Sequence, residues 1–171
     1  PDFKGVDLSG ADLEGADLAG AILFSVNFTG ATLKDADLTG ARGLGADFSD
    51  ADLTGAGLGF GEWGSASFVG ADLAGADVST AHLDQVDFTN ANLAGADLSG
   101  RFLPGVIFVG TDLRTVDLSG AHLSGADFTN ANLTGADLSG AHLGETDYTA
   151  GEFFTDNWPG SGYLGPATFV N

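Results

Sequence analysis

Hydrophobic residues recur every five positions along most of this chain. If each five-residue word is numbered by its third residue, Leu, Phe, Val, Trp or Tyr stands at 28 of 29 centres between Leu8 and Tyr148, and Gly43 is the exception. The first residue of the word is Ala or Val in 25 of the 29 cases. A period of five matches neither the 3.6 residues of an α-helical turn nor the strict alternation of a long strand. It predicts a chain that makes a short extended side, turns a corner and begins again.

Aromatic residues add a second, longer period of twenty. The aromatic centres are Phe28, Phe48, Phe68, Phe88, Phe108 and Phe128, with Tyr148 next. This spacing indicates four words per coil, so that like residues stack on one another between coils. Self-similarity at a fixed period is typical of repeat architectures. We therefore predict an all-β solenoid of about 7–8 coils, each of which is stabilised by its stacked neighbours.

The five-residue word is abandoned near the end of the chain. We predict two parts, a solenoid over residues 1–150 and a capping tail over residues 151–171. The tail contains Phe153, Phe154, Trp158, Tyr163 and Phe169 among Pro and Gly. An open solenoid end exposes core side chains and unpaired strand edges, so a terminal unit is usually an atypical cap. A partner-binding role for these aromatic residues is the alternative.

With this word and this coil, the sequence resembles the pentapeptide-repeat family, whose word is A-(D/N)-L-x-x. The word ADLSG at residues 96–100 is one of many examples, and the resemblance runs from about Phe3 to Tyr148. It implies a right-handed quadrilateral β-helix. It implies little about activity, because most members of the family have no known reaction. A subset of the family acts as B-DNA mimics that bind DNA gyrase and related topoisomerases.

The composition restricts the class of partner. Five Lys and Arg residues against 24 Asp and Glu residues give a net charge of −19, which argues against direct binding of nucleic acid or of an anionic membrane. With 43% apolar residues in strict periodicity, the chain is not of the disordered class. The absence of Cys excludes disulfides and thiolate metal sites.

The sequence contains no apolar run long enough for a transmembrane helix and no signal-peptide pattern. It begins at Pro1, already in register with the repeat, so we expect a processed or trimmed product. The compartment stays open on these grounds: the cytoplasm is slightly favoured, and an exported or lumenal protein is the alternative.

The period of twenty assigns each outward residue to one of four sides. The side with centres such as Leu18 and Leu98, here called the Asp side, carries an acidic column at the second word position: Asp17, Asp37, Asp77, Asp97, Asp117 and Asp137, with a gap at Gly57. Such a column could mimic the phosphates of DNA. The regularity also has a simpler cause, because short Asp, Asn, Ser and Thr side chains readily bond to nearby backbone N–H groups.

The side with centres such as Leu23 and Leu103, here called the fourth side, differs from the other three. It and the adjoining corner carry our candidate partner-binding residues: Ile22, Phe24, Leu44, Phe102, Pro104, Ile107 and Val109, with His82, His122 and His142 along the flank. A contiguous exposed apolar patch usually marks an interaction surface. The alternative is local repair of an imperfect core, because Gly43, Gly61 and Arg101 occupy inward positions of this side. In particular, Gly43 could make room for Trp63 one coil later.

Catalytic, cofactor and metal sites are not expected. A filled solenoid lacks the concave pocket in which a nucleophile, a base and an oxyanion donor converge. His122 and His142 should be neighbours in successive coils, but a flat column presents parallel ligands where a metal site needs convergent ones.

We therefore predict a non-catalytic, rigid scaffold that docks another protein, or a larger assembly, through the fourth side. The alternative is an acidic B-DNA mimic that binds and regulates DNA gyrase or another type II topoisomerase. Self-association through the apolar side or an open solenoid end is a third hypothesis.

Overall fold

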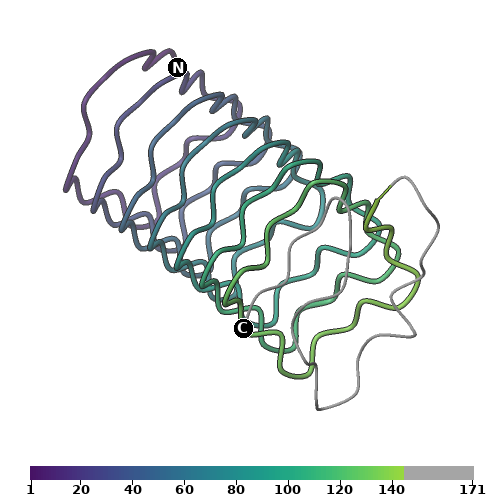
Figure 1. Cartoon of the computed structure of the whole chain (residues 1–171). Coiled ribbons are helices and arrows are strands. Elements are labelled where there is room, and N and C mark those ends of the chain that lie inside the picture. The colour runs from purple at the N-terminus through teal and green to yellow at the C-terminus, as the bar shows by residue number, and fades with distance from the viewer. Residues whose placement is uncertain (145–171) are drawn as a thin grey trace.

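The computed structural model describes residues 1–144, and the predicted tail at residues 151–171 lies outside the described part. Figure 1 shows the chain winding around one axis as a stack of similar coils. Parallel bridges join residues that are twenty apart, such as Asp7 with Asn27 and Asn27 with Asp47. Bridges of this register occur along the rod from Asp2 to His142, with two pairs missing. This register confirms four words per coil.

Residues 1–144 contain no helix and no continuous strand. Each word contributes one bridge residue, its second, before the chain turns at the fourth and fifth residues. At a typical corner the Val6 N–H donates to the Phe3 carbonyl over 2.8 Å. The fifth residue has a positive φ in 27 of the 28 words that end between Gly5 and Gly140. A hydrogen-bonded turn with positive φ at its third residue is a type II turn, which favours Gly there.

The core is a filled column, because the first and third residues of each word point inward. The stacked Phe rings lie 4.8 Å apart between Phe28 and Phe48, 4.8 Å between Phe48 and Phe68, and 5.3 Å between Phe68 and Phe88. All of these rings are buried. The prediction that like residues stack on like is confirmed, and the planes of neighbouring rings in this series lie within 22° of parallel.

Trp63 is the largest buried side chain in the described part of the chain, and two glycines accommodate it. A Cβ atom added to Gly43 or to Gly61 would overlap the indole ring of Trp63. The indole N–H donates to the Leu58 carbonyl over 3.1 Å, so the buried polar atom is satisfied. The prediction that Gly43 makes room for Trp63 is confirmed.

The ladder between coils is interrupted around Arg101. Every second-position pair from Asp2 to His142 forms a bridge except two, Asp77 with Asp97 and His82 with Phe102. Arg101 lies between these two pairs at an inward word position that normally holds Ala or Val. Its side chain is half-exposed, and its Nε donates to the Ser99 carbonyl over 3.4 Å. We attribute the opening to the long charged side chain, which cannot be buried without a partner.

Arg101→Ala should therefore stabilise the fold. Closing the ladder would restore bridge hydrogen bonds worth about 1 kcal/mol each, while the weak bond to Ser99 contributes little. We expect the free energy of unfolding in urea to rise by about 1–3 kcal/mol. Amide hydrogen exchange at Leu83 and Phe102 should slow in the variant. Unchanged exchange at these two amides would show that Arg101 does not hold the coils apart.

Candidate docking surfaces

The outward residues of the fourth side form one column along the rod. Successive bridges join Ile22, Arg42, Glu62 and His82, and a second run joins Phe102, His122 and His142. The ladder opening at Arg101 separates the two runs. His82 and His122 are exposed and His142 is half-buried. The predicted column is therefore present, but it is divided.

The first group of predicted residues consists of Ile22, Phe24 and Leu44. Leu44 is 56% exposed, whereas Ile22 and Phe24 are half-buried. The guanidinium of Arg42 lies 4.8 Å from the centre of the Phe24 ring, a cation–π contact. The Nε of Arg42 also donates to the Glu62 carboxylate over 2.9 Å. Part of this apolar group is thus covered by the protein itself.

The second group consists of Phe102, Pro104, Ile107 and Val109. The Phe102 side chain is 64% exposed, and the other three are half-buried. On the fourth side, the Phe102 ring lies 6.0 Å from the His122 ring, which in turn stacks on His142 at 4.7 Å. Around the corner, Ile107 bridges to Asp87 in one neighbouring coil and to Asp127 in the other. This group is an apolar patch with carboxylates on both sides.

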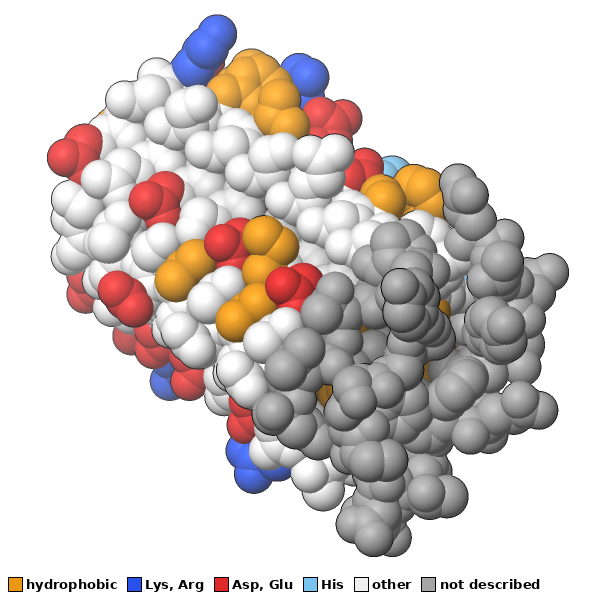
Figure 2. Space-filling model, viewed as in Figure 1, with side chains coloured by type: hydrophobic (Ala, Val, Ile, Leu, Met, Phe, Trp, Pro, Cys, Tyr) orange, Lys and Arg blue, Asp and Glu red, His pale blue; other side chains and the backbone are white. Residues whose placement is uncertain are grey.

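The two groups do not form one continuous surface. Pro104 lies three coils beyond Leu44 in the same corner column, which at about 4.8 Å per coil is about 14 Å. Gly64 and Asp84 occupy the intervening places. Figure 2 shows the hydrophobic side chains of the visible face in separate groups with acidic side chains beside them. Arg42 covers part of the first group, whereas Phe102 remains open.

Among residues 1–144, the most exposed large hydrophobic residue is one that our sequence reasoning did not select. Phe60 is 68% exposed and lies at the corner between the Asp side and the fourth side. It has φ +55° at a turn position that Gly occupies in 18 words. An aromatic residue at the Gly position of the word was the sequence signal that could have identified it.

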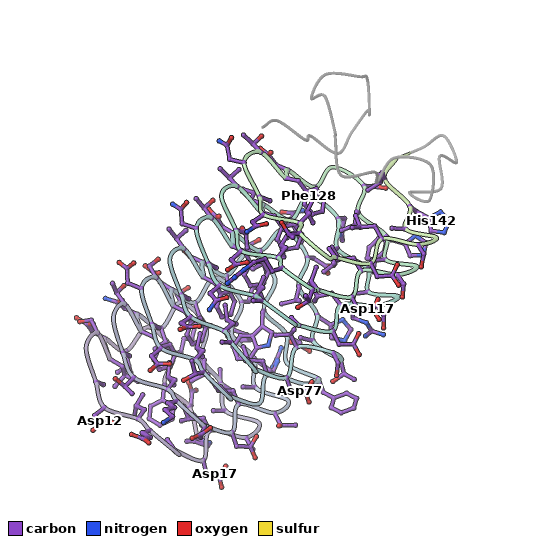
Figure 3. All side chains as sticks on the ribbon, turned by 90° about the horizontal axis from the view of Figure 1, so that it is seen from below. Asp12, Asp17, Asp77, Asp117, Phe128 and His142 are labelled. Atoms are coloured by element: carbon purple, nitrogen blue, oxygen red, sulfur yellow. The ribbon has the colours of Figure 1, made fainter. Side chains whose placement is uncertain are left out.

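The Asp side has the acidic column expected from the sequence. Figure 3 shows Asp17, Asp77 and Asp117 along one edge of the rod. The six carboxylates of the column share one hydrogen-bonding pattern, in which Oδ1 accepts the backbone N–H two residues later. For example, the Ser119 N–H donates to Asp117 over 2.8 Å. The prediction that short side chains bond to nearby backbone is confirmed. The carboxylates of the column therefore serve in part to stabilise the turn that follows each of them.

These hydrogen bonds favour the ionised carboxylates. The hydroxyl and then the N–H of Thr39 lower the pKa of Asp37, while the N–H and then the hydroxyl of Ser99 and Ser139 lower the pKa of Asp97 and Asp137. Because the pKa is lower in the folded state, the stabilisation is present above pH 3.8 and is lost as the pH falls through the folded values.

Carboxyl NMR titration should give midpoints below 3.8 for Asp37, Asp97 and Asp137. In Ser99→Ala the midpoint of Asp97 should rise only part of the way, because the backbone N–H at residue 99 remains the stronger donor. If the midpoint of Asp97 returned fully to the ordinary value in Ser99→Ala, the hydroxyl and not the backbone N–H would be responsible for the lowered pKa.

Two further observations on the described residues concern metal sites and membrane-spanning helices. Among residues 1–144, no group of three or more His, Asp or Glu side chains is placed to hold a metal ion. The described part of the chain also has no helix that could cross a membrane.

Comparisons with known proteins agree with the repeat. The family model of pentapeptide repeats, eight copies long, matches residues 2–40, 21–58, 66–100 and 103–147. A search of curated proteins found no match.

Several solved structures are similar to this chain. One is a pentapeptide repeat protein from the thylakoid lumen of Arabidopsis thaliana, with 33% identity, a TM-score of 0.45, and coverage of 66% of this chain and 68% of that chain. HetL, a pentapeptide repeat protein involved in heterocyst differentiation regulation from a Nostoc cyanobacterium, has 30% identity and a TM-score of 0.39; the match covers 84% of this chain and 64% of HetL.

A third is a trypsin-treated form of QnrB1, a plasmid-mediated fluoroquinolone resistance protein, with 27% identity, a TM-score of 0.37, and coverage of 84% of this chain and 80% of that chain. The matched repeats extend over most of the sequence, and the twenty-residue coil carries the same word on every side. The chain therefore belongs to the pentapeptide-repeat family.

Proposed function

We propose that this chain is a non-catalytic scaffold that docks a partner protein through the fourth side and its adjoining corner. The observation that carries the proposal is the exposed Phe102 ring beside Pro104, Ile107 and Val109. Burial of an exposed aromatic ring is among the strongest contributions to a protein interface. His122 and His142 extend the contact along the column. Ile22, Phe24, Leu44 and His82 would form a second, smaller contact.

The test is a paired substitution in the second group. Phe102→Asp with Ile107→Asp should abolish co-purification of the partner while leaving the far-UV CD spectrum unchanged. Thr32→Asp with Asn132→Asp is the matched control, because it adds the same charge at second word positions of another side. Retained binding in the first variant, or equal loss in the control, would rule out this surface.

A second candidate function rests on the Asp side. Five of the six carboxylates in its column are exposed and Asp117 is half-buried, and several have a lowered pKa that keeps them ionised. This arrangement supports an acidic B-DNA mimic that binds DNA gyrase or another type II topoisomerase. The column is interrupted at Gly57, and the ladder opens between Asp77 and Asp97.

If the chain is a B-DNA mimic, it should inhibit the supercoiling activity of DNA gyrase in a dose-dependent way. Salt should weaken the inhibition, because it screens the exposed charges, and Asp97→Asn with Asp117→Asn should weaken it further. No effect at micromolar protein would eliminate this candidate, and the fourth-side variant described above should leave the inhibition unchanged.

A further inference from the structure

Four departures from the repeat occur together at the corner between the Asp side and the fourth side. The word at residues 56–60 is AGLGF, so Gly57 replaces the usual Asp, Gly59 stands in the turn, and Phe60 replaces the usual Gly. One coil later, Thr80 occupies the fifth word position. It is the single fifth residue between Gly5 and Gly140 whose φ is not positive. The repeat itself requires none of these residues, because neighbouring coils form the same corner without them.

The two glycines place no side chain between two carboxylates; Gly57 is half-buried, whereas Gly59 is buried beneath the Thr80 hydroxyl. Gly57 bridges to Asp37 on one side and to Asp77 on the other. Oδ1 of Asp37 lies 3.8 Å from the place where a Cβ of Gly57 would be, and Oδ2 of Asp77 lies 3.6 Å from that of Gly59. Both carboxylates therefore lie close to this coil, one on each side of it. Asp37 and Asp77 themselves are two coils apart, which is about 10 Å.

Phe60 follows Gly59 directly and has a strained conformation. Its φ is +55°, which a residue with a side chain rarely adopts. Its N–H donates to the Thr80 hydroxyl over 3.0 Å, where the regular corner uses a backbone carbonyl. The ring is 68% exposed and makes no aromatic or cation–π contact within residues 1–144. The chain thus holds an aromatic ring in solvent at a place where Gly would fit better.

The fourth side provides an internal example of what such a ring can bind. There, the Arg42 guanidinium lies over the Phe24 ring at 4.8 Å and also pairs with the Glu62 carboxylate. An aromatic ring and a carboxylate together recognise a guanidinium through cation–π attraction and charge-assisted hydrogen bonds. At Phe60 the ring and the carboxylates are present, and the described residues supply no cation to the ring.

We propose that Phe60, Asp37 and Asp77 form a docking point for an arginine in a basic segment of a partner protein. The guanidinium lies against the Phe60 ring, and the carboxylates of Asp37 and Asp77 approach it from the two neighbouring coils on either side of Gly57, which has no side chain to separate them. Charge complementarity favours a basic occupant over a second copy of this chain, whose net charge is also −19. The proposal concerns a different corner from the Phe102 surface and does not depend on it.

The test uses the full chain and a fluorescein-labelled peptide of alternating Arg and Gly, with an alternating Glu and Gly peptide as the negative control. Binding is measured by fluorescence anisotropy at low salt. Phe60→Gly should weaken binding of the Arg peptide at least fivefold. The fold should tolerate this variant, because Gly occupies the same turn position in 18 words. Asn130→Gly is the matched control, since it makes the same kind of change at the fifth word position of another corner, and it should leave binding unchanged within twofold.

A second variant separates this docking point from general attraction to an acidic rod. Gly57→Asp completes the acidic column, and the added Cβ would meet only Thr39 Oγ1 at 3.4 Å and Asp37 Oδ1 at 3.8 Å. If charge alone binds the peptide, this variant binds it more tightly. The proposal predicts weaker binding, because the new side chain fills the space between the two carboxylates.

Unchanged binding in Phe60→Gly, or tighter binding in Gly57→Asp, would overturn the proposal. A dimer that light scattering detects without peptide, and that disappears in Phe60→Gly, would overturn it as well, because the occupant would then be a second copy.

Discussion

Phe68→Ala should lower the free energy of unfolding by about 3–5 kcal/mol, because it leaves a cavity that the rigid column cannot close. Phe68 is fully buried and lies near the middle of the stack. Its ring contacts the faces of Phe48 and Phe88, with centres 4.8 and 5.3 Å away, and the edge of Trp63 at 6.4 Å. Backbone hydrogen bonds to the adjoining coils restrain inward movement of the chain, so we expect little relaxation.

Urea unfolding monitored by far-UV CD measures this effect. Phe60→Gly is the control, because it removes the same side chain from an exposed turn and should leave the stability unchanged or slightly higher. Equal losses in the two variants would mean that stacking in the core contributes nothing specific. A loss below about 1 kcal/mol in Phe68→Ala would mean that neighbouring coils collapse into the cavity.

The second large effect is a coupling between Gly43 and Trp63. Gly43→Leu alone should cost at least about 3 kcal/mol, because even a Cβ atom at this place overlaps the indole ring. Trp63→Leu alone should cost on the order of 2 kcal/mol or more, because it leaves a cavity and removes the hydrogen bond to the Leu58 carbonyl.

The double variant should regain most of the stability lost in both single variants. The two new leucines would continue the regular buried column of Leu23, Leu83 and Leu103. A double-mutant cycle measured by urea unfolding should then show a coupling of about 3 kcal/mol, at the upper end of values for contacting residues. Additive losses in the double variant would mean that Gly43 and Trp63 do not share one space.

Much of the fold could be predicted from the sequence because the fold is one local rule repeated. An apolar residue every five positions required a corner every five positions, and a Phe every twenty placed like side chains on top of one another. The exchange between Gly43 and Trp63 was also accessible, since the smallest and largest side chains occupy neighbouring places in the same column. The alignment of the Asp residues in one column could be predicted from the same period of twenty.

The candidate surfaces could be predicted only in part. The column that contains Phe102 and His122 was identified, but the register alone could not show that Arg42 covers Phe24. Phe60 was missed because the fifth word position was treated as a turn and not as a surface.

The sequence by itself determined the period, the four sides and the direction in which each side chain points, because these depend on local geometry that every word repeats. Only the tertiary structure decided which outward side chains remain exposed, because exposure depends on contacts between coils. Arg42 of one coil covers Phe24 of the coil before it. The bridges between coils are missing beside Arg101, and no neighbouring coil covers Phe60 or Phe102.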